Sequence, residues 1–372
     1  MGTGLQMIGQ SAVLRATSSA DFRRRSASPS IAAWLLICCA LLFAMILVGG
    51  ITRLTHSGLS ITEWQPISGI LPPLDRAAWT EEFRKYQATP EYQLVNRGMS
   101  LPEFQSIFWW EYVHRLLGRL IGVVFFVPLF YFAVRRRLAA DLILRLGGVL
   151  ALGGVQGVLG WYMVQSGLVH DPRVSPLRLA AHLVLAFLIL GSMLWTALTL
   201  LYPAKGEGPV TLRPLLRAAL CLSGLILVMV ASGALVAGLH AGLGYNTFPL
   251  MNGHWVPPEW LAIRTWYANF SSNVVTAQFD HRLVAWALMA LTPWFWWRAR
   301  SRSVPGGRAR RALDLLLLAL VVQVVLGIST LLLVVPVPLA AAHQGGAVLL
   351  FAASVNAAHA LYRESSGRPA AG

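Results

Sequence analysis

Charged residues are scarce in this chain, and acidic residues are scarcer than basic ones. Asp, Glu, Lys and Arg make up 12% of the 372 residues, with 15 acidic against 30 basic side chains. A soluble domain carries about 25% charged residues. Because 56% of the chain is hydrophobic, its composition excludes an ordinary soluble protein and predicts that a lipid bilayer surrounds most of it.

Cysteine is also scarce. The three cysteines, Cys38, Cys39 and Cys221, all fall inside long apolar stretches and none lies in a loop on the outer side. A framework of disulfides is therefore not expected.

Long apolar stretches make up most of the chain. A stretch of about 20 apolar residues is long enough to cross a bilayer as a helix. Eight such stretches are present, at about 31–52, 107–134, 146–167, 179–201, 215–239, 273–297, 313–335 and 340–361. The sequence thus predicts an all-α polytopic membrane protein with eight transmembrane helices.

The net charge of +15 is distributed as in a membrane protein rather than a nucleic-acid-binding protein. Basic residues gather in every second connection, at 23–25, 135–137 and 298–311 and at Lys205, Arg213 and Arg217. Basic loops face the cytoplasm, so we expect both termini there and no nucleic-acid partner.

The first 30 residues are polar and basic, like the front of a signal peptide. The apolar run that follows is about twice as long as a signal peptide's, so we expect residues 1–30 to be a cytoplasmic segment before a retained anchor helix. A mitochondrial presequence is the alternative interpretation.

The chain contains an internal repeat. Aligning His114 with His281 sets WEYVHRLLG over AQFDHRLVA, and VQGVLG at 155–160 matches VQVVLG at 322–327, both at an offset of 167. LAAHLVLAF at 179–187 matches LAAAHQGGAVLLF at 339–351 at an offset of 161, and a looser match of 48–59 with 230–243 brings His56 near His240.

These matches predict two four-helix bundles, at 31–201 and 215–361, joined by a cytoplasmic linker at 202–214 and followed by a cytoplasmic tail at 362–372. Four helices separate equivalent positions, so the halves have the same topology and a pseudo-symmetry axis along the membrane normal. The alternative is that helices rich in Leu, Gly and Ala resemble one another by composition alone.

Four histidines occupy repeated places. His114, His182, His281 and His343 each lie in the first turns of a span that begins on the outer side. An ionisable group within a span is a candidate functional group, and two facing imidazoles suit the axial positions of a haem iron. The alternative is that each histidine forms a hydrogen bond between helices.

Other residues near this depth are candidates for contacts with a haem. Arg115 and Arg282 could meet propionates, or extend to the lipid headgroups. Four aromatic residues could pack on the ring or belong to the interfacial belt: Trp109, Trp110, Phe279 and Trp286. His56 and His240 end their spans on the outer side and could line the mouths of the sites. The remaining histidines, which have no repeat partner, are expected in loops or at the membrane interface: His170, His254 and His359.

The two candidate sites differ in one acidic residue. Glu111 lies three residues before His114, on the same helix face, whereas Gln278 occupies the equivalent position in the second half. A carboxyl group at this place is a candidate proton acceptor or donor for chemistry on a bound molecule, or else a structural group bonded to a neighbouring helix. Asp280 lies next to His281, about 100° around the helix.

Several of these motifs resemble the haem A synthases of the proteobacterial and mitochondrial type. The resemblance is carried by GGITRLTHSGLSITEWQPISGILPPL (49–74), EYVHRLLGR (111–119), GLHAGLGYNTFPLMNG (238–253), FDHRLVAW (279–286) and AAAHQ (340–344). It implies eight helices in two pseudo-symmetric four-helix bundles. The implied reaction oxidises a methyl group of haem O to a formyl group through successive hydroxylations, giving haem A for cytochrome oxidase.

The resemblance also assigns roles. It implies that His281 and His343 ligate a haem b cofactor, that His114 and His182 ligate the substrate haem, and that Glu111 is the catalytic acidic residue. The chain lacks the cysteine pair that some bacterial members carry in the first outer loop. The implied location is the bacterial inner membrane, or else the mitochondrial inner membrane. A haem O synthase is the implied partner, while the sequence leaves open the electron acceptor and whether the chain forms a homo-oligomer.

Two other functions are compatible with the histidine pattern. One is a di-haem b-type cytochrome that exchanges electrons with quinone, in which Glu111 would serve quinol deprotonation. The other is a haem transporter, although the outer depth of all four histidines provides no site at the middle of the membrane.

Overall fold

The structure, a computed structural model, describes residues 3–65, 68–169, 172–202, 212–301 and 306–365. These residues are almost entirely helical, with one isolated antiparallel bridge between Met251 and His254. The long helices are α1 (Thr3–Leu54), α4 (Leu101–Val134), α5 (Ala140–Gln165), α6 (Pro176–Leu201), α7 (Arg213–Gly238), α9 (Val274–Arg300), α10 (Gly307–Leu332) and α11 (Val337–Ser365). Every predicted span is therefore a helix.

Seven of these helices, within the described residues, are long and apolar enough to cross a membrane. The eighth, α9, is 27 residues long but falls outside this group. Its sequence includes Asp280, His281 and Arg282 near one end and Arg298 and Arg300 at the other, which lowers its hydropathy. The prediction of a helical polytopic membrane protein is confirmed, with seven candidate spans and one more polar long helix.

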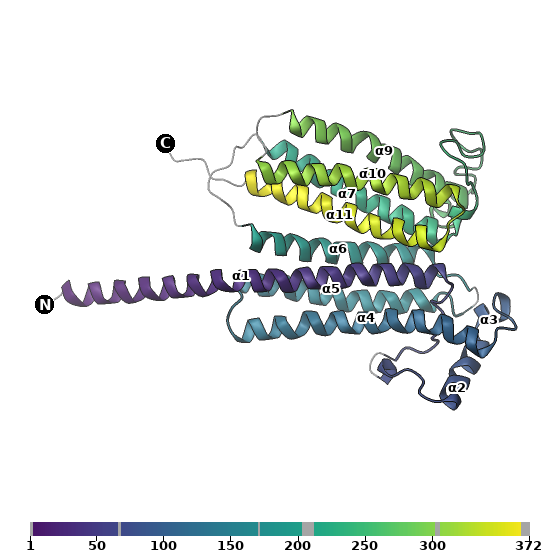
Figure 1. Cartoon of the computed structure of the whole chain (residues 1–372), viewed down its shortest axis with the longest axis horizontal. Coiled ribbons are helices and arrows are strands. Elements are labelled where there is room, and N and C mark those ends of the chain that lie inside the picture. The colour runs from purple at the N-terminus through teal and green to yellow at the C-terminus, as the bar shows by residue number, and fades with distance from the viewer. Residues whose placement is uncertain (1–2, 66–67, 170–171, 203–211, 302–305, 366–372) are drawn as a thin grey trace.

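The long helices lie side by side in two groups (Figure 1). Helices α1, α4, α5 and α6 form one group, and α7, α9, α10 and α11 form the other. The groups meet where α6 packs against α7 and α11, and where α1 packs against α11. A continuous apolar core runs across this junction, with Leu35, Phe187, Ile226 and Phe351 among its buried side chains.

Both long connections lie at the same end of the helices, opposite the N-terminus (Figure 1). The first contains two short helices, α2 (Arg76–Gln87) and α3 (Pro90–Leu94). Asp75 caps α2 by accepting from the amide of Ala78, a favourable partner for the free N–H groups there. Tyr86 and Phe104 anchor this segment on α4, since both are fully buried and their rings stack 5.2 Å apart.

One expectation about the unrepeated histidines is wrong. His359 is fully buried within α11, where its ring bonds Thr199 and Arg308, because it fills the contact of α6 with α10 and α11. His254 does lie in a loop, in the bridge with Met251. His170, most of the linker at 202–214 and most of the tail at 362–372 lie outside the described residues.

Candidate haem sites in the two helix groups

The four repeated histidines project from four different helices. His114 lies on α4 and His182 on α6, while His281 lies on α9 and His343 on α11. The rings of His114 and His182 are close enough to interact electrostatically, and so are those of His281 and His343. All four side chains keep some accessible surface, as a ligand must. The structure thus brings together the two pairs that the sequence predicts.

Each of these imidazoles packs against a glycine on a neighbouring helix. A Cβ atom added to Gly49 would lie 2.8 Å from Nε2 of His114, and one added to Gly327 would lie 2.8 Å from Cε1 of His343. The corresponding distances to Cε1 are 3.1 Å from Gly160 to His182 and 3.2 Å from Gly233 to His281. Ordinary contacts of a Cβ begin near 3.4 Å, so glycine is what lets these rings occupy their places.

The histidines on α6 and α11 share a second feature. The amide of Gln156 donates to the backbone carbonyl of His182, and the amide of Gln323 donates to that of His343, both at 3.0 Å. The buried Nδ1 atoms of His182 and His343 have no hydrogen-bond partner among the residues that the structure describes. Most buried polar atoms in proteins have a hydrogen-bond partner, so these two nitrogen atoms are exceptions.

The residues present therefore fit haem. The two imidazoles of each group are close enough to interact electrostatically, and their donor atoms are of the type that haem iron takes as axial ligands. In the described part of the chain, three or more His, Cys, Asp or Glu side chains nowhere gather as they would around a metal ion. This leaves the histidine pairs as the candidate metal ligands.

Ser232 on α7 is a site residue that sequence reasoning missed. Its Oγ lies 2.8 Å from Nδ1 of His281 and 2.9 Å from the carbonyl oxygen of Met229. The sequence offered one signal for Ser232, which is its position directly before Gly233 in a helix that is otherwise apolar there. Which face of α7 meets His281 could not be read from sequence.

Glu111 is held by several donors. It is 3% exposed, and its Oε1 accepts from Nε and Nη2 of Arg115 at 3.1 and 2.7 Å. Its Oε2 accepts from the hydroxyl of Ser60 and from the amide of Ile61, both at 2.8 Å. Glu111 therefore fastens the chain that follows α1 onto α4, which corresponds to the structural alternative for this residue. A catalytic role for it remains a prediction.

The two candidate propionate-binding arginines bind loop carbonyls. Arg115 donates to the carbonyl oxygens of Ile61 and Glu63 at 2.7 and 2.9 Å. Arg282 is 6% exposed and donates to those of Tyr245 and Thr247 at 2.7 and 2.8 Å. Each guanidinium thus holds the loop that follows the first helix of its group, and contact with a propionate remains a prediction.

His56 and His240 contact each other across the junction of the two groups. Their rings stack 5.7 Å apart with an interplanar angle of 5°. Each residue has φ of 52° in the turn after its helix, a left-handed conformation that reverses the chain direction. Burial, with a smaller effect of the Arg53 charge, lowers the pKa of His240 to about 4, so this ring is neutral at pH 7.

Helix α1 contacts both candidate sites through adjacent glycines. Gly49 meets His114, while a Cβ atom on Gly50 would collide with the side chain of Gln344. Gln344 follows His343 on α11, and its amide donates to the carbonyl of Ile46 on α1 at 2.7 Å. One turn of α1 therefore contacts a histidine of the first pair and the residue next to a histidine of the second pair.

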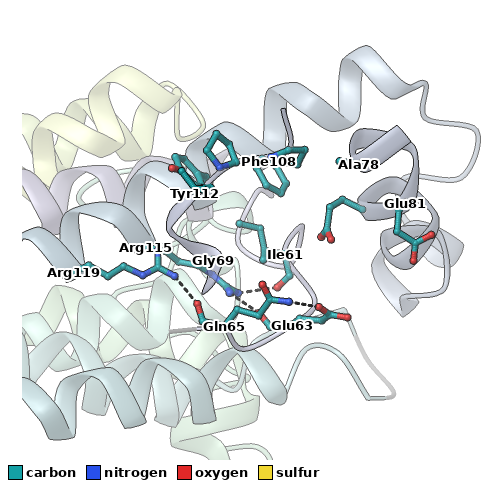
Figure 2. A pocket seen from close by; sticks show the side chains of 14 residues that line it. Ile61, Glu63, Gln65, Gly69, Ala78, Glu81, Phe108, Tyr112, Arg115 and Arg119 are labelled. Carbon is teal, nitrogen blue, oxygen red and sulfur yellow. Dashed lines mark hydrogen bonds between the residues drawn. The ribbon is translucent and has the colours of Figure 1, made fainter. Parts of the chain in front are cut away.

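The outer loop also forms a surface pocket beside α4 (Figure 2). Arg115 and Arg119 lie along one side of it, and Glu63 and Gln65 come from the loop. Arg119 donates to the carbonyl of Gln65 at 2.8 Å. The arginines thus secure the loop over the outer end of α4.

Glu91 on α3 is a second buried carboxyl group that sequence reasoning did not single out. It is 4% exposed, and its Oε2 is buried with no hydrogen-bond partner. Burial, and to a smaller extent the charge of Glu111, raises the pKa of Glu91 to about 8. No motif marks this residue, because its burial depends on how α3 packs in the outer segment.

Three of the four candidate ring-packing aromatics, Trp109, Phe279 and Trp286, contact other aromatic side chains. Trp109 packs against Trp79 and Tyr112 and is 43% exposed, and Trp110 is 37% exposed. Phe279 and Trp286 lie 6.5 Å apart. Asp280 accepts from the indole of Trp260 at 3.1 Å. A role for the four aromatics beside a haem remains a prediction.

The chain matches a known family and close relatives over most of its length. Residues 32–355 match COX15-CtaA, described as cytochrome oxidase assembly protein. A protein of Nitrosospira multiformis named "Heme A synthase" is 57% identical over 336 residues, which cover 90% of this chain and 94% of that one. Proteins of the same name from Nitrosomonas eutropha and Parvibaculum lavamentivorans are 55% and 49% identical, covering 87% and 89% of this chain and 92% and 94% of theirs.

These matches include all the motifs on which the resemblance was based and both histidine pairs. They confirm the family predicted from sequence, whose members are oxidoreductases that bind haem in the membrane. The chain belongs to the haem A synthase family.

Proposed function

We propose that this chain is a haem A synthase that oxidises a methyl group of haem O to a formyl group. The substrate haem is held by His114 and His182, and a resident haem b by His281 and His343. The observation that carries the proposal is the presence of two imidazole pairs, each ring resting on a glycine of a neighbouring helix. Haem b, when bound, supplies one-electron redox chemistry.

In this scheme the chain's own residues bind the two haems and orient the ligand histidines and the loops around them. Gln156 and Gln323 bond the backbones of His182 and His343, which fixes the helix faces that carry these ligands. Arg115 and Arg282 hold the outer loops over the two sites. Glu111 is the acidic group nearest in sequence to a substrate ligand, and it exchanges protons with the reacting side of the N-terminal site.

We also propose that the two groups arose by duplication, as bundles at 31–201 and 215–361 related by pseudo-symmetry. Support comes from contacts that recur at constant offsets. Gly160 and Gly327 both meet a ligand histidine and differ by 167 positions, and Gln156 and Gln323, which bond the same two histidines, also differ by 167. Similar composition alone does not place equivalent residues against equivalent histidines.

The chain lies in a bacterial inner membrane in this proposal, with both termini in the cytoplasm. The basic clusters in alternate connections support this orientation, and the two long connections lie together at the opposite end. The substrate reaches the site from a haem O synthase, and electrons leave to an acceptor that we do not assign.

Pigment analysis tests the proposal. The purified chain should contain one tightly held haem b together with variable haem O or haem A, identified by chromatography and mass spectrometry. His281→Ala or His343→Ala should remove the haem b absorption spectrum, whereas His114→Ala should keep it and stop haem A formation. Two equal haem b groups with no haem O or A would instead indicate a di-haem cytochrome. Purification without any retained haem would indicate a transporter.

A further inference from the structure

Ser232 distinguishes the two histidine pairs, because its hydroxyl group contacts both a backbone carbonyl and the ring of His281. The hydroxyl group has one proton to donate, and the carbonyl oxygen of Met229 can only accept it, at 2.9 Å. When that proton goes to Met229, the contact of 2.8 Å with the ring of His281 is made by Nδ1–H donating to Oγ. A neutral imidazole has one N–H, so Nε2 of His281 is left with a free electron pair for a metal.

The position equivalent to Ser232 in the other group is apolar. Gly49 and Gly233 both meet a ligand histidine, and His56 and His240 both end their helices in the same left-handed turn. Each of these pairs is separated by 184 positions, and the same offset places Val48 opposite Ser232. A valine side chain neither donates nor accepts hydrogen bonds, so it cannot fix the tautomer of His114.

The ring orientations differ accordingly. His281 turns Cε1 and Nδ1 towards Gly233, at 3.2 and 3.7 Å from its added Cβ, so Nε2 is not among the atoms closest to α7. His114 turns Nε2 and Cδ2 towards Gly49, at 2.8 and 3.2 Å. A histidine whose outer nitrogen is bonded is a more basic and better oriented ligand.

We propose that Ser232 is a positioning residue that makes the C-terminal haem site a resident one, and that Val48 keeps the N-terminal site exchangeable. The inference rests on the proposed function, in which one haem is retained and the other must enter as substrate and leave as product. It explains how two similar imidazole pairs can serve a cofactor and a substrate.

Ser232→Ala tests the first half of this inference in the full-length purified protein. We expect haem b to be lost about 10–100-fold faster in detergent washes, the usual effect of removing a bond to a metal ligand. The midpoint potential of the remaining haem b should rise, because a less basic imidazole stabilises the ferric state less. Ser232→Thr, which keeps a hydroxyl group, should restore both properties.

Ser223→Ala is the matched control. Ser223 lies on the same helix, is 9% exposed, and among the described residues its hydroxyl group bonds only the carbonyl of Ala219 in its own helix. Its variant should retain haem b with unchanged potential. If Ser232→Ala and Ser223→Ala show the same retention and the same midpoint potential of haem b, the role of Ser232 is overturned. Absence of haem b from the unsubstituted protein would overturn the proposed function instead.

Val48→Ser tests the second half. The introduced hydroxyl should bond Nδ1 of His114 once the ring turns over and frees Nε2 for iron, so the variant should purify with more haem O and haem A per haem b than the unsubstituted protein and should release them more slowly. An unchanged pigment ratio and release rate would show that this position does not control exchange.

Discussion

Replacing Gly327 by alanine should weaken haem b binding without destabilising the apoprotein. The new Cβ would lie 2.8 Å from Cε1 of His343, whereas ordinary contacts begin near 3.4 Å, so the ring must move by about 0.6 Å. Ligand geometry has to be held within about 0.5 Å. The apoprotein should lose little stability, because alanine in a helix is favoured over glycine by about 1 kcal/mol, which offsets the cost of displacing the ring.

A graded series makes the reasoning quantitative. Gly233→Ala places its Cβ 3.2 Å from His281, which requires a shift of about 0.2 Å, and should have a smaller effect on haem b. Gly224→Ala lies on the same helix as Gly233 with nothing within 4 Å, so it should keep haem b and be slightly more stable.

The assay is the absorption spectrum of the reduced and oxidised protein, with haem content measured on the extracted pigment and melting temperature measured on the apoprotein. The expected order of haem b retention is Gly224→Ala, then Gly233→Ala, then Gly327→Ala, with loss of the six-coordinate spectrum in the last. Equal spectra and haem contents in Gly327→Ala and Gly224→Ala would refute the argument that glycine at position 327 leaves room for the imidazole of His343.

Three further predictions concern the outer end of the helices. Glu91 binds its proton more tightly in the folded protein (pKa about 8) than when unfolded (about 4.5), a difference of about 5 kcal/mol, so folding stability should fall as pH rises between these values. Glu91→Gln should therefore remove most of this decline, as melting temperatures from pH 4 to 9 would show; identical pH profiles would contradict it. Glu111→Gln should retain haem b but stop haem A formation, measured by pigment analysis, and undiminished haem A would exclude a catalytic role. Arg282→Gln should lower the free energy of unfolding by about 2 kcal/mol or more, and so lower the melting temperature, because several loop carbonyls lose a charged donor. Faster haem loss in addition would support the propionate contact. An unchanged melting temperature would contradict the role of Arg282 in holding the loop.

The sequence alone determined the class of protein and indicated the candidate ligands. Hydropathy marks a span wherever about 20 apolar residues occur together, so every long helix was found, including α9, which falls outside the candidate spans of the structure. The four histidines could be paired because each recurs at a repeated place near the start of a span. The family followed from local motifs, which need no knowledge of how the helices pack.

Tertiary structure decided which side chains meet these ligands. Ser232, Gly327 and the other glycines that pack against these histidines are ordinary residues of apolar helices. Their importance depends on which faces of neighbouring helices contact each other. The sequence predicts Arg282 as a candidate propionate contact, and only the path of the loop shows that its guanidinium also donates to loop carbonyl groups. Burial of Glu91 likewise depends on how α3 packs. Periodicity specifies that a residue is in a helix, but only packing specifies what the residue faces.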